Sequence, residues 1–269
     1  MGCIEKFENA EPMAYCIYSP LALGNLEDLR RDEEVPLSTQ LVLMHDYLKA
    51  LTYLHEEKKV MHRDIKPLNL GVSSLNPPTG VVFDFDSATL DPTSNNHMHG
   101  TISFLAPEIV DIKRWDEIRK TLAAGGQRMT VKRPPSYGRK VDIWALGLTA
   151  FLLYTRKKEY STIINNAAYS TLKDQIESLL KDTMTEYVAT EYLKLISQMM
   201  EWDPLKRLSA VEALRAEFWA EVPKNEPKEL SASLKRYQEL DISLDTYPTK
   251  SNRRRSSTMR TESTTMTSL

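Results

Sequence analysis

The stretch HRDIKPLNL, residues 62–70, gathers a histidine, two cations, an acid and an amide within nine residues. Asp64 is suited to accept or orient the proton of an attacking hydroxyl group. Lys66 can neutralise charge on a phosphate, and Asn69 offers a neutral oxygen of the kind that Mg²⁺ prefers. Together these groups suit phosphoryl transfer, in which an enzyme mainly supplies positioning, metal ions and countercharge.

The pattern H-R-D-x-K-x-x-N fixes five residue types and is therefore specific. It resembles the catalytic loop of the eukaryotic protein kinases, and the lysine two residues after the aspartate is typical of the serine/threonine type. The resemblance implies an α+β, protein kinase-like fold with a mostly helical C-terminal lobe and a few short N-terminal strands. It also implies phosphoryl transfer from ATP, with Mg²⁺, to Ser or Thr of a protein substrate.

Further motifs of the same family follow in the expected order. Asp84, in VVFDFD, corresponds to the family's second Mg²⁺ ligand, and Thr101, in GTISFLAPEI, to the threonine that contacts the catalytic acid and lysine. The resemblance also implies that Asp142, in VDIWALG, holds the backbone of the catalytic loop. Arg207 corresponds to the arginine that pairs with the glutamate of A-P-E, which here is Glu108.

The resemblance assigns the nucleotide as well. Counting back from the glycine of LGNLE makes residues 18–21 the hinge, with the carbonyl of Ser19 and the amide of Leu21 facing adenine. Leu70 is then expected to lie under the purine, and Asn25 to reach the ribose. The proline at position 20 removes only its own amide, so the two hinge hydrogen bonds survive.

Three departures from the family pattern affect the prediction of activity. The sequence contains no G-x-G motif and no strand lysine before the hinge, and it has Asp86 where the family has glycine. We therefore expect an incomplete, weakly active or inactive form of a serine/threonine kinase. The alternative is a pseudokinase-type binding or scaffold module. Small-molecule phosphotransferases form a third class, but they generally lack the A-P-E segment.

The residues around these motifs predict the elements that position them. MGCIEKF and MAYCIY fit a hairpin, and apolar residues at three- and four-residue steps predict a helix from Ser38, its expected N-cap, to about Glu57. LGVS and VVFDFDSA suggest a pair of antiparallel strands flanking the site, and helical patterns dominate residues 141–219. We expect a kinase-like domain over residues 1–222 and a tail over 223–269, which is disordered from about residue 251.

Charge and composition bound the partners. The net charge is −2 and no signal peptide or long apolar run is present, so we expect a cytoplasmic or nuclear protein that binds neither nucleic acid nor membrane. Residues 111–140, however, hold nine Lys or Arg against three Asp or Glu. This basic insertion is expected to be either a solvated, mobile spacer or a site that recruits an acidic protein substrate.

Overall fold

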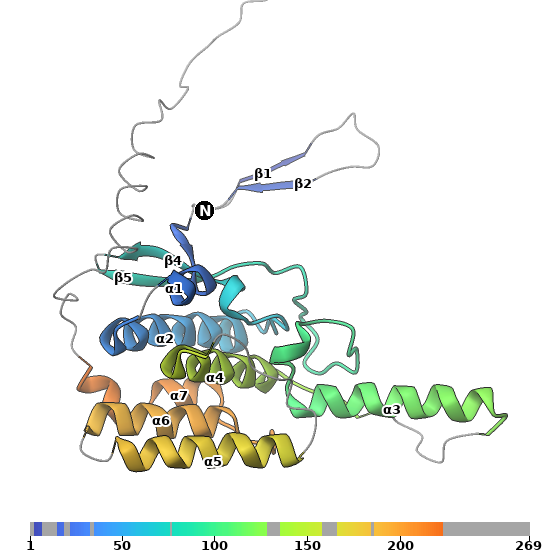
Figure 1. The fold of residues 1–269 in the computed structure, drawn as a ribbon. Coiled ribbons are helices and arrows are strands. Elements are labelled where there is room, and N and C mark those ends of the chain that lie inside the picture. The colour runs from blue at the N-terminus through green and yellow to red at the C-terminus, as the bar shows by residue number, and fades with distance from the viewer. Residues whose placement is uncertain are drawn as a thin grey trace, which may run out of the picture.

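The structure is a computed structural model, and it describes residues 3–6, 15–18, 22–32, 35–75, 77–127, 135–157, 166–183 and 186–222 (Figure 1). The strands are β1 (Cys3–Lys6), β2 (Tyr15–Tyr18), β3 (Gly24–Asn25), β4 (Leu70–Leu75) and β5 (Pro78–Val82). The helices are α1 (Leu26–Asp32), α2 (Leu37–Thr52), α3 (Pro107–Ala124), α4 (Lys140–Thr155), α5 (Asn166–Asp182), α6 (Tyr187–Met199) and α7 (Ala210–Leu214). Hinge residues Ser19 and Leu21 and the predicted tail lie outside the described residues.

Two small antiparallel sheets confirm that the predicted strands pair, but the strand expected in VVFDFDSA begins earlier, at Pro78, and ends at Val82, so residues 83–88 are not part of it. β1 pairs with β2, with Cys3 opposite Tyr18, and β3, β4 and β5 form a second sheet in that order. Within the second sheet Leu70 lies opposite Val82. This register places Asn69, one residue before β4, and Asp84, two residues after β5, at the same end of the strand pair.

Helix α2 follows the predicted apolar spacing but begins differently. Leu41, Met44, Leu48 and Leu51 are buried on its inner face. The helix begins at Leu37, directly after Pro36, and no side chain caps it, so the expected N-cap at Ser38 is wrong. Pro36 is the N-cap residue, with φ of −55° and ψ of 145°, and its carbonyl accepts the first helical hydrogen bond, from Gln40 N–H at 3.0 Å. A proline fits this position because no N–H bond is needed there.

The end of α2 leads directly to the HRD loop, residues 62–70. The helix continues as a single π-helical turn, Tyr53–Glu57, and Lys58 N donates to Tyr53 O. Such wider turns are rare and often occur next to functional sites. Here the turn carries His55, which is buried, toward the same region as His62.

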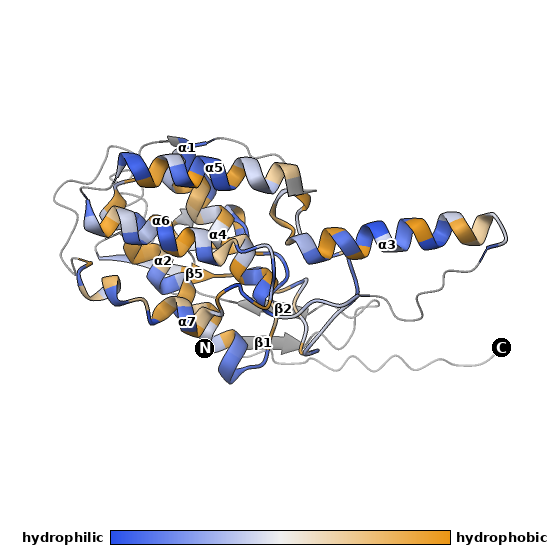
Figure 2. Ribbon diagram, turned by 90° about the horizontal axis from the view of Figure 1, so that it is seen from below, coloured by the Kyte–Doolittle hydropathy of each residue, from blue (hydrophilic) through white to orange (hydrophobic). Residues whose placement is uncertain are grey.

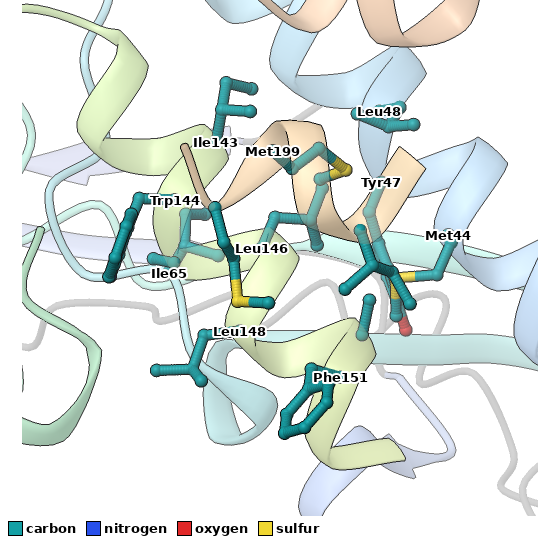
Figure 3. Close-up of a cluster of buried hydrophobic side chains, with 14 of the residues drawn as sticks. Met44, Tyr47, Leu48, Ile65, Ile143, Trp144, Leu146, Leu148, Phe151 and Met199 are labelled. Atoms are coloured by element: carbon teal, nitrogen blue, oxygen red, sulfur yellow. The ribbon is translucent and has the colours of Figure 1, made fainter. Parts of the chain in front are cut away.

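Helix α4 forms the centre of the core. Every residue from Val141 to Leu153 is buried, which is the pattern of a helix surrounded by protein on all sides. Figure 3 shows Trp144, Leu146 and Phe151 of α4 packed with Tyr47 of α2 and Met199 of α6. A rigid, fully enclosed helix of this kind can fix the position of any group attached to it.

Helix α3 extends away from the remaining helices (Figure 1 and Figure 2). Only Pro107, Ile109 and Ile112 are buried, all in its first two turns. The expectation of a mobile insertion is therefore wrong for residues 111–124, which continue a regular helix. Across the described ranges, no helix is long and apolar enough to span a membrane.

Candidate active site

Asp142 anchors the HRD loop to the core from the first turn of α4. Its Oδ2 accepts a hydrogen bond from the backbone N–H of His62 at 2.8 Å, and its Oδ1 accepts one from Arg63 N–H at 2.8 Å. His55 Nε2, from the π-helical turn, lies 2.8 Å from Oδ2. Because Asp142 is 1% exposed, these three contacts replace the water that a carboxylate otherwise needs.

Opposing influences act on the ionisation of Asp142. Burial by itself raises the pKa of this carboxyl group, but the hydrogen bond to His55 and the electrostatic effects of His55 and His62 outweigh burial and hold the pKa below its ordinary value. Hydrogen bonds to the charged form of an acid favour that form. The anchor is therefore a carboxylate under neutral conditions.

Asp64 lies at the centre of a hydrogen-bond network on the outer side of the same loop. Its Oδ1 accepts from Thr101 Oγ1 at 2.9 Å, and its Oδ2 accepts from Lys66 Nζ at 2.8 Å and from Asn69 Nδ2 at 3.0 Å. Lys66 Nζ also donates to Thr101 Oγ1 at 3.0 Å. The structure thus brings together the four residues that the sequence predicts as catalytic.

The network orients each group without using all of its bonding capacity. A carboxylate has about four acceptor sites, and the contacts to Asp64 occupy three of them, so one remains for a substrate hydroxyl group. Asn69 is fixed through its amide nitrogen, which also donates to Asp64 O at 2.8 Å. Within the described residues the oxygen of Asn69 has no hydrogen-bond donor, which leaves it able to bind a cation.

Asp84 lies near Asn69 through the backbone of the strand pair. Phe83 N donates to Asn69 O at 3.2 Å, and His62 Nε2 lies 3.1 Å from Phe83 O. Asp84 is exposed and has φ of +65°, a left-handed angle that costs a non-glycine residue about 1 kcal/mol or more. The chain thus keeps Asp84 in an unfavourable backbone conformation, with its carboxylate exposed beside the site.

These oxygens fit a Mg²⁺ ion that also binds phosphate. In the part of the chain that the structure describes, no three His, Cys, Asp or Glu side chains form a metal site by themselves. Mg²⁺ commonly takes only one or two protein oxygens and completes its shell with water and substrate phosphates. Asn69 Oδ1 and the Asp84 carboxylate are the groups that would hold it.

Asp86 does not have the strained backbone that replacement of a glycine suggests. The non-glycine residues with positive φ among those described are Lys59, Arg63, Asp84 and Arg156. Asp86 is exposed and follows Phe85 in a turn closed by the Ala88 N–H. Asp86 therefore adds an exposed carboxylate without backbone strain.

Two of the predicted nucleotide contacts, Leu70 and Asn25, lie among the described residues and differ in their surroundings. Leu70 begins β4 and is fully buried. Asn25, expected at the ribose, accepts a hydrogen bond from Asp28 N–H at 3.0 Å through Oδ1 and so caps the start of α1. In this structure its side-chain oxygen serves the helix, which leaves its amide nitrogen for a ligand.

A buried ion pair between Arg207 and Glu108 fixes the segment after Thr101. Arg207 Nη1 and Nη2 donate to the two oxygens of Glu108 at 2.7 and 2.9 Å. The Arg207 side chain is fully buried, and its Nε donates to Glu201 O at 2.8 Å. The Arg207–Glu108 pairing that the motif order predicts is therefore present, as is the contact of Asp142 with the loop.

Sequence reasoning missed two features of this site. One is His55, whose isolated position in a helical pattern gave no signal of its contact with Asp142. The other is α1, where the run LEDLRR places Glu27 within reach of cations three and four residues later. That spacing could have been recognised as a charged helix beside the site.

Comparison with known proteins agrees with the geometry. The protein kinase domain family matches residues 3–219. Mitogen-activated protein kinase kinase 1 of Arabidopsis thaliana is 27% identical over 203 residues, which are 72% of this chain and 51% of that protein. Serine/threonine-protein kinase cds1 of Schizosaccharomyces pombe is 28% identical over 236 residues, which are 83% of this chain and 45% of that protein. The chain spans about half the length of the curated relatives it matches.

A solved structure shares the fold. The crystal structure of the yeast RNA Pol II CTD kinase CTDK-1 complex matches with a TM-score of 0.56 and 20% identity, covering 85% of this chain and 78% of that chain. At this identity the match shows the fold alone. With the family match over most of its length, the chain belongs to the eukaryotic protein kinase superfamily, serine/threonine type.

Proposed function

We propose that the protein transfers the terminal phosphoryl group of ATP to Ser or Thr of a protein substrate. The observation that carries the proposal is the network in which Asp64 contacts Lys66, Asn69 and Thr101. A binding module has no chemical need for a carboxylate that a lysine, an amide and a hydroxyl group each contact at 2.8 to 3.0 Å. Phosphoryl transfer needs all three.

Each residue has a defined task in this proposal. Asp64 orients the substrate hydroxyl group and accepts its proton, while Thr101 keeps the carboxylate in place. Lys66, already beside Asp64, neutralises charge that develops on the transferred group. Asn69 and Asp84 hold Mg²⁺, which when bound lowers the negative charge of the phosphates.

The adenine is assigned by resemblance to residues 18–21 and Leu70. Leu70 is fully buried in this structure, so its contact with a purine would require the side chain to become accessible. Asn25 contributes through its amide nitrogen, since its oxygen caps α1. Ser19 and Leu21 would contribute only backbone groups, so their side chains are free to vary.

We expect the rate of transfer by these 269 residues alone to be low. The family covers the phosphates with a G-x-G-x-x-G loop followed by a strand that carries a lysine, and this sequence has no such glycine-rich loop. Loss of one preorganised charge-stabilising contact typically lowers the rate about 10²- to 10³-fold. The alternative, a scaffold that binds partners without chemistry, is favoured by this absence but not by the intact network around Asp64.

The test combines nucleotide binding with phosphate transfer. Thermal unfolding of the full chain should shift upward with millimolar Mg·ATP, and the shift should shrink in Asp84→Asn and disappear with EDTA. Radiolabel transfer to a degenerate library of Ser- and Thr-containing peptides should be slow and should vanish in Asp64→Asn. Asp174→Asn, on an exposed part of α5, is the matched control and should change neither readout.

The outcomes separate the two candidate functions. A Mg·ATP-dependent shift with transfer that requires Asp64 supports the kinase. No shift and no transfer would reject it in favour of the scaffold. Transfer that survives Asp64→Asn would reject the roles assigned to the network.

A further inference from the structure

A groove of about 640 Å³ lies beside the Asp64 network, between α1 and the HRD loop. Lys66 and Thr101 lie in its wall, and they contact the two oxygens of Asp64 at 2.8 and 2.9 Å. The turn after Thr101 and helix α4 contribute the rest of the wall. A peptide that places its hydroxyl group at Asp64 would therefore have neighbouring residues in this groove.

The charged groups that line the groove are bonded to groups of the protein. On α1, Arg30 Nε donates to Glu27 Oε2 at 2.6 Å, and Arg31 Nε donates to Glu27 Oε1 at 2.8 Å. Lys66 pairs with Asp64. Over its whole length α1 holds three acids against two arginines. Charge therefore gives no reason to expect that the groove selects an acidic or a basic side chain.

Leu68 is a large apolar side chain that the fold leaves accessible in this wall. It lies in the short 3-10 turn Pro67–Asn69 and is 50% exposed, although the residues on either side of it are buried. Phe104 and Leu152 line the same groove and add to its apolar surface. Removal from water stabilises a leucine side chain, so at Leu68 about half of that gain is still available to a ligand.

The turn that carries Leu68 is fixed relative to the catalytic groups. It packs against α1, and Asn69 at its end donates from Nδ2 to Asp64 O at 2.8 Å and to Asp64 Oδ2 at 3.0 Å. Leu68 therefore keeps a constant position beside Asp64. A ligand that covers a surface already held in place does not have to order it first, which favours binding.

The basic insertion, residues 111–140, offers no comparable surface among the described residues. Residues 111–124 hold four cations against three acids, a surplus of one. Arg139 and Lys140 donate to the backbone carbonyls of Lys59 and Arg207. The described part of the insertion thus gives little support for recruitment of acidic substrates, and the apolar groove is the stronger basis for selection.

We propose that this groove selects protein substrates with a large apolar side chain close to the phosphorylated Ser or Thr, and that Leu68 is the residue that recognises it. The inference rests on the proposed function and names its substrate class. The apolar side chain of the substrate would cover Leu68 and leave water itself, while the ion pairs of α1 stay intact. A polar side chain laid against Leu68 would lose hydration without gaining a hydrogen bond from it.

The test measures peptide binding, which does not require catalysis. Fluorescence anisotropy of the full chain is recorded with peptides that hold one Ser in a carrier of Gly and Ala and one Leu, Phe, Asn, Glu or Lys at each flanking position in turn. Leu and Asn are similar in size, so their difference isolates the apolar contribution. At one or two positions Leu or Phe should bind about three- to tenfold more tightly than Asn. Because the contact is apolar, this difference should persist at high salt.

Variants of exposed apolar residues assign the preference to Leu68. Leu68→Asn and Leu68→Ala should both reduce it to less than about twofold, whereas Leu68→Met keeps the apolar surface and should retain it. Ile102→Asn changes an exposed side chain that follows Thr101 but does not line the groove, and the preference at the same position should remain. Leu205→Asn, at an 88% exposed leucine, is the matched control and should also leave it intact. Thermal unfolding of each variant shows whether it is still folded.

Each result decides the inference. Equal binding of Leu and Asn peptides at every position, tighter binding of Glu or Lys peptides than of Leu peptides, or no peptide binding at all would overturn it. A preference that survives Leu68→Asn or Leu68→Ala in a folded protein, or one that is lost in folded Ile102→Asn, would overturn the assignment to Leu68. Phosphate transfer without any apolar preference would reject this inference alone, whereas apolar preference without transfer would reject only the proposed function.

Discussion

The fold holds the HRD loop and the segment that faces it in different ways. The HRD loop, residues 62–70, is attached to the buried carboxylate of Asp142 and contains the buried residues His62, Ile65 and Leu70. The facing segment, residues 84–99, exposes large apolar side chains such as Leu90 and Met98. Several of its N–H groups bond only to side chains two residues away.

The groups proposed to carry out the chemistry are therefore held differently from the segment proposed to contact the substrate. The groups that would act on every substrate are fixed to the centre of the core through α4. The segment that would meet a particular substrate combines local turns with two isolated backbone bridges, Met61–Thr89 and Ser94–Tyr137, so it is attached at separate points and not to a buried carboxylate. Burying a charged group is costly. Because the buried carboxylate of Asp142 holds the HRD loop and not the facing segment, we infer that the geometry of the HRD loop is the one that must stay constant.

The largest effect should come from removal of the anchor. Asp142→Ala leaves the N–H groups of His62 and Arg63 and the side chain of His55 without their acceptor in the core. We expect a loss of about 3–5 kcal/mol in the free energy of unfolding, measured by urea denaturation. Asp91→Ala, in the facing segment, is the control and should leave the unfolding midpoint nearly unchanged. Similar losses for both variants would contradict the contrast.

Arg207→Lys should have the next largest effect. Lysine keeps the charge but cannot make the two parallel bonds to Glu108, and it loses the bonds to backbone carbonyls. We expect a loss of about 2–4 kcal/mol, because buried donors and acceptors remain unpaired. Arg119→Lys, whose exposed arginine pairs with Asp116, is the matched control. A loss no larger than that of the control would show that the pair is dispensable.

Gly100→Ala tests the contact between the two segments and should cost less. Gly100 has φ of +91°, and an added Cβ would lie 2.8 Å from the carbonyl oxygen of Arg63. The facing segment must shift to relieve this, at a cost of about 1–3 kcal/mol. Gly138→Ala, where the nearest atom is 3.6 Å away, is the control. Weaker phosphate transfer together with a melting temperature lower by a few degrees would support this prediction, and a melting temperature equal to that of Gly138→Ala would contradict it.

The sequence predicted the contacts that hold the HRD loop, but it did not predict how the facing segment is held. The HRD loop, Asp142 and the Arg207–Glu108 pair could be expected, because fixed residue types at fixed spacing specify contacts that the core requires. Helix α2 and the strand pair followed from apolar periodicity. The start of α2 was misplaced because a Ser side chain and a Pro backbone both favour a helix start, and Pro36 determined it.

The remaining features depend on tertiary contacts that no local pattern encodes. His55 reaches Asp142 from 87 residues away in the chain, through a π-helical turn whose position the apolar spacing does not specify. Residues 111–124 were misjudged because their charges predict exposure, and an exposed helix and a mobile loop have the same composition. The ion pairs of α1 depend on how Glu27 distributes its oxygens between Arg30 and Arg31, which only the packed structure determines.

Site-resolved hydrogen exchange of backbone amides tests the contrast most directly. The amides of His62 and Arg63, which donate to Asp142, should exchange at least about a hundredfold more slowly than those of Asp91, Asn96 and Met98. In Asp142→Asn the protection of the Arg63 amide should fall toward that of the facing segment. Equal exchange of the two sets in the wild-type protein, or protection of Arg63 that persists in Asp142→Asn, would contradict the account.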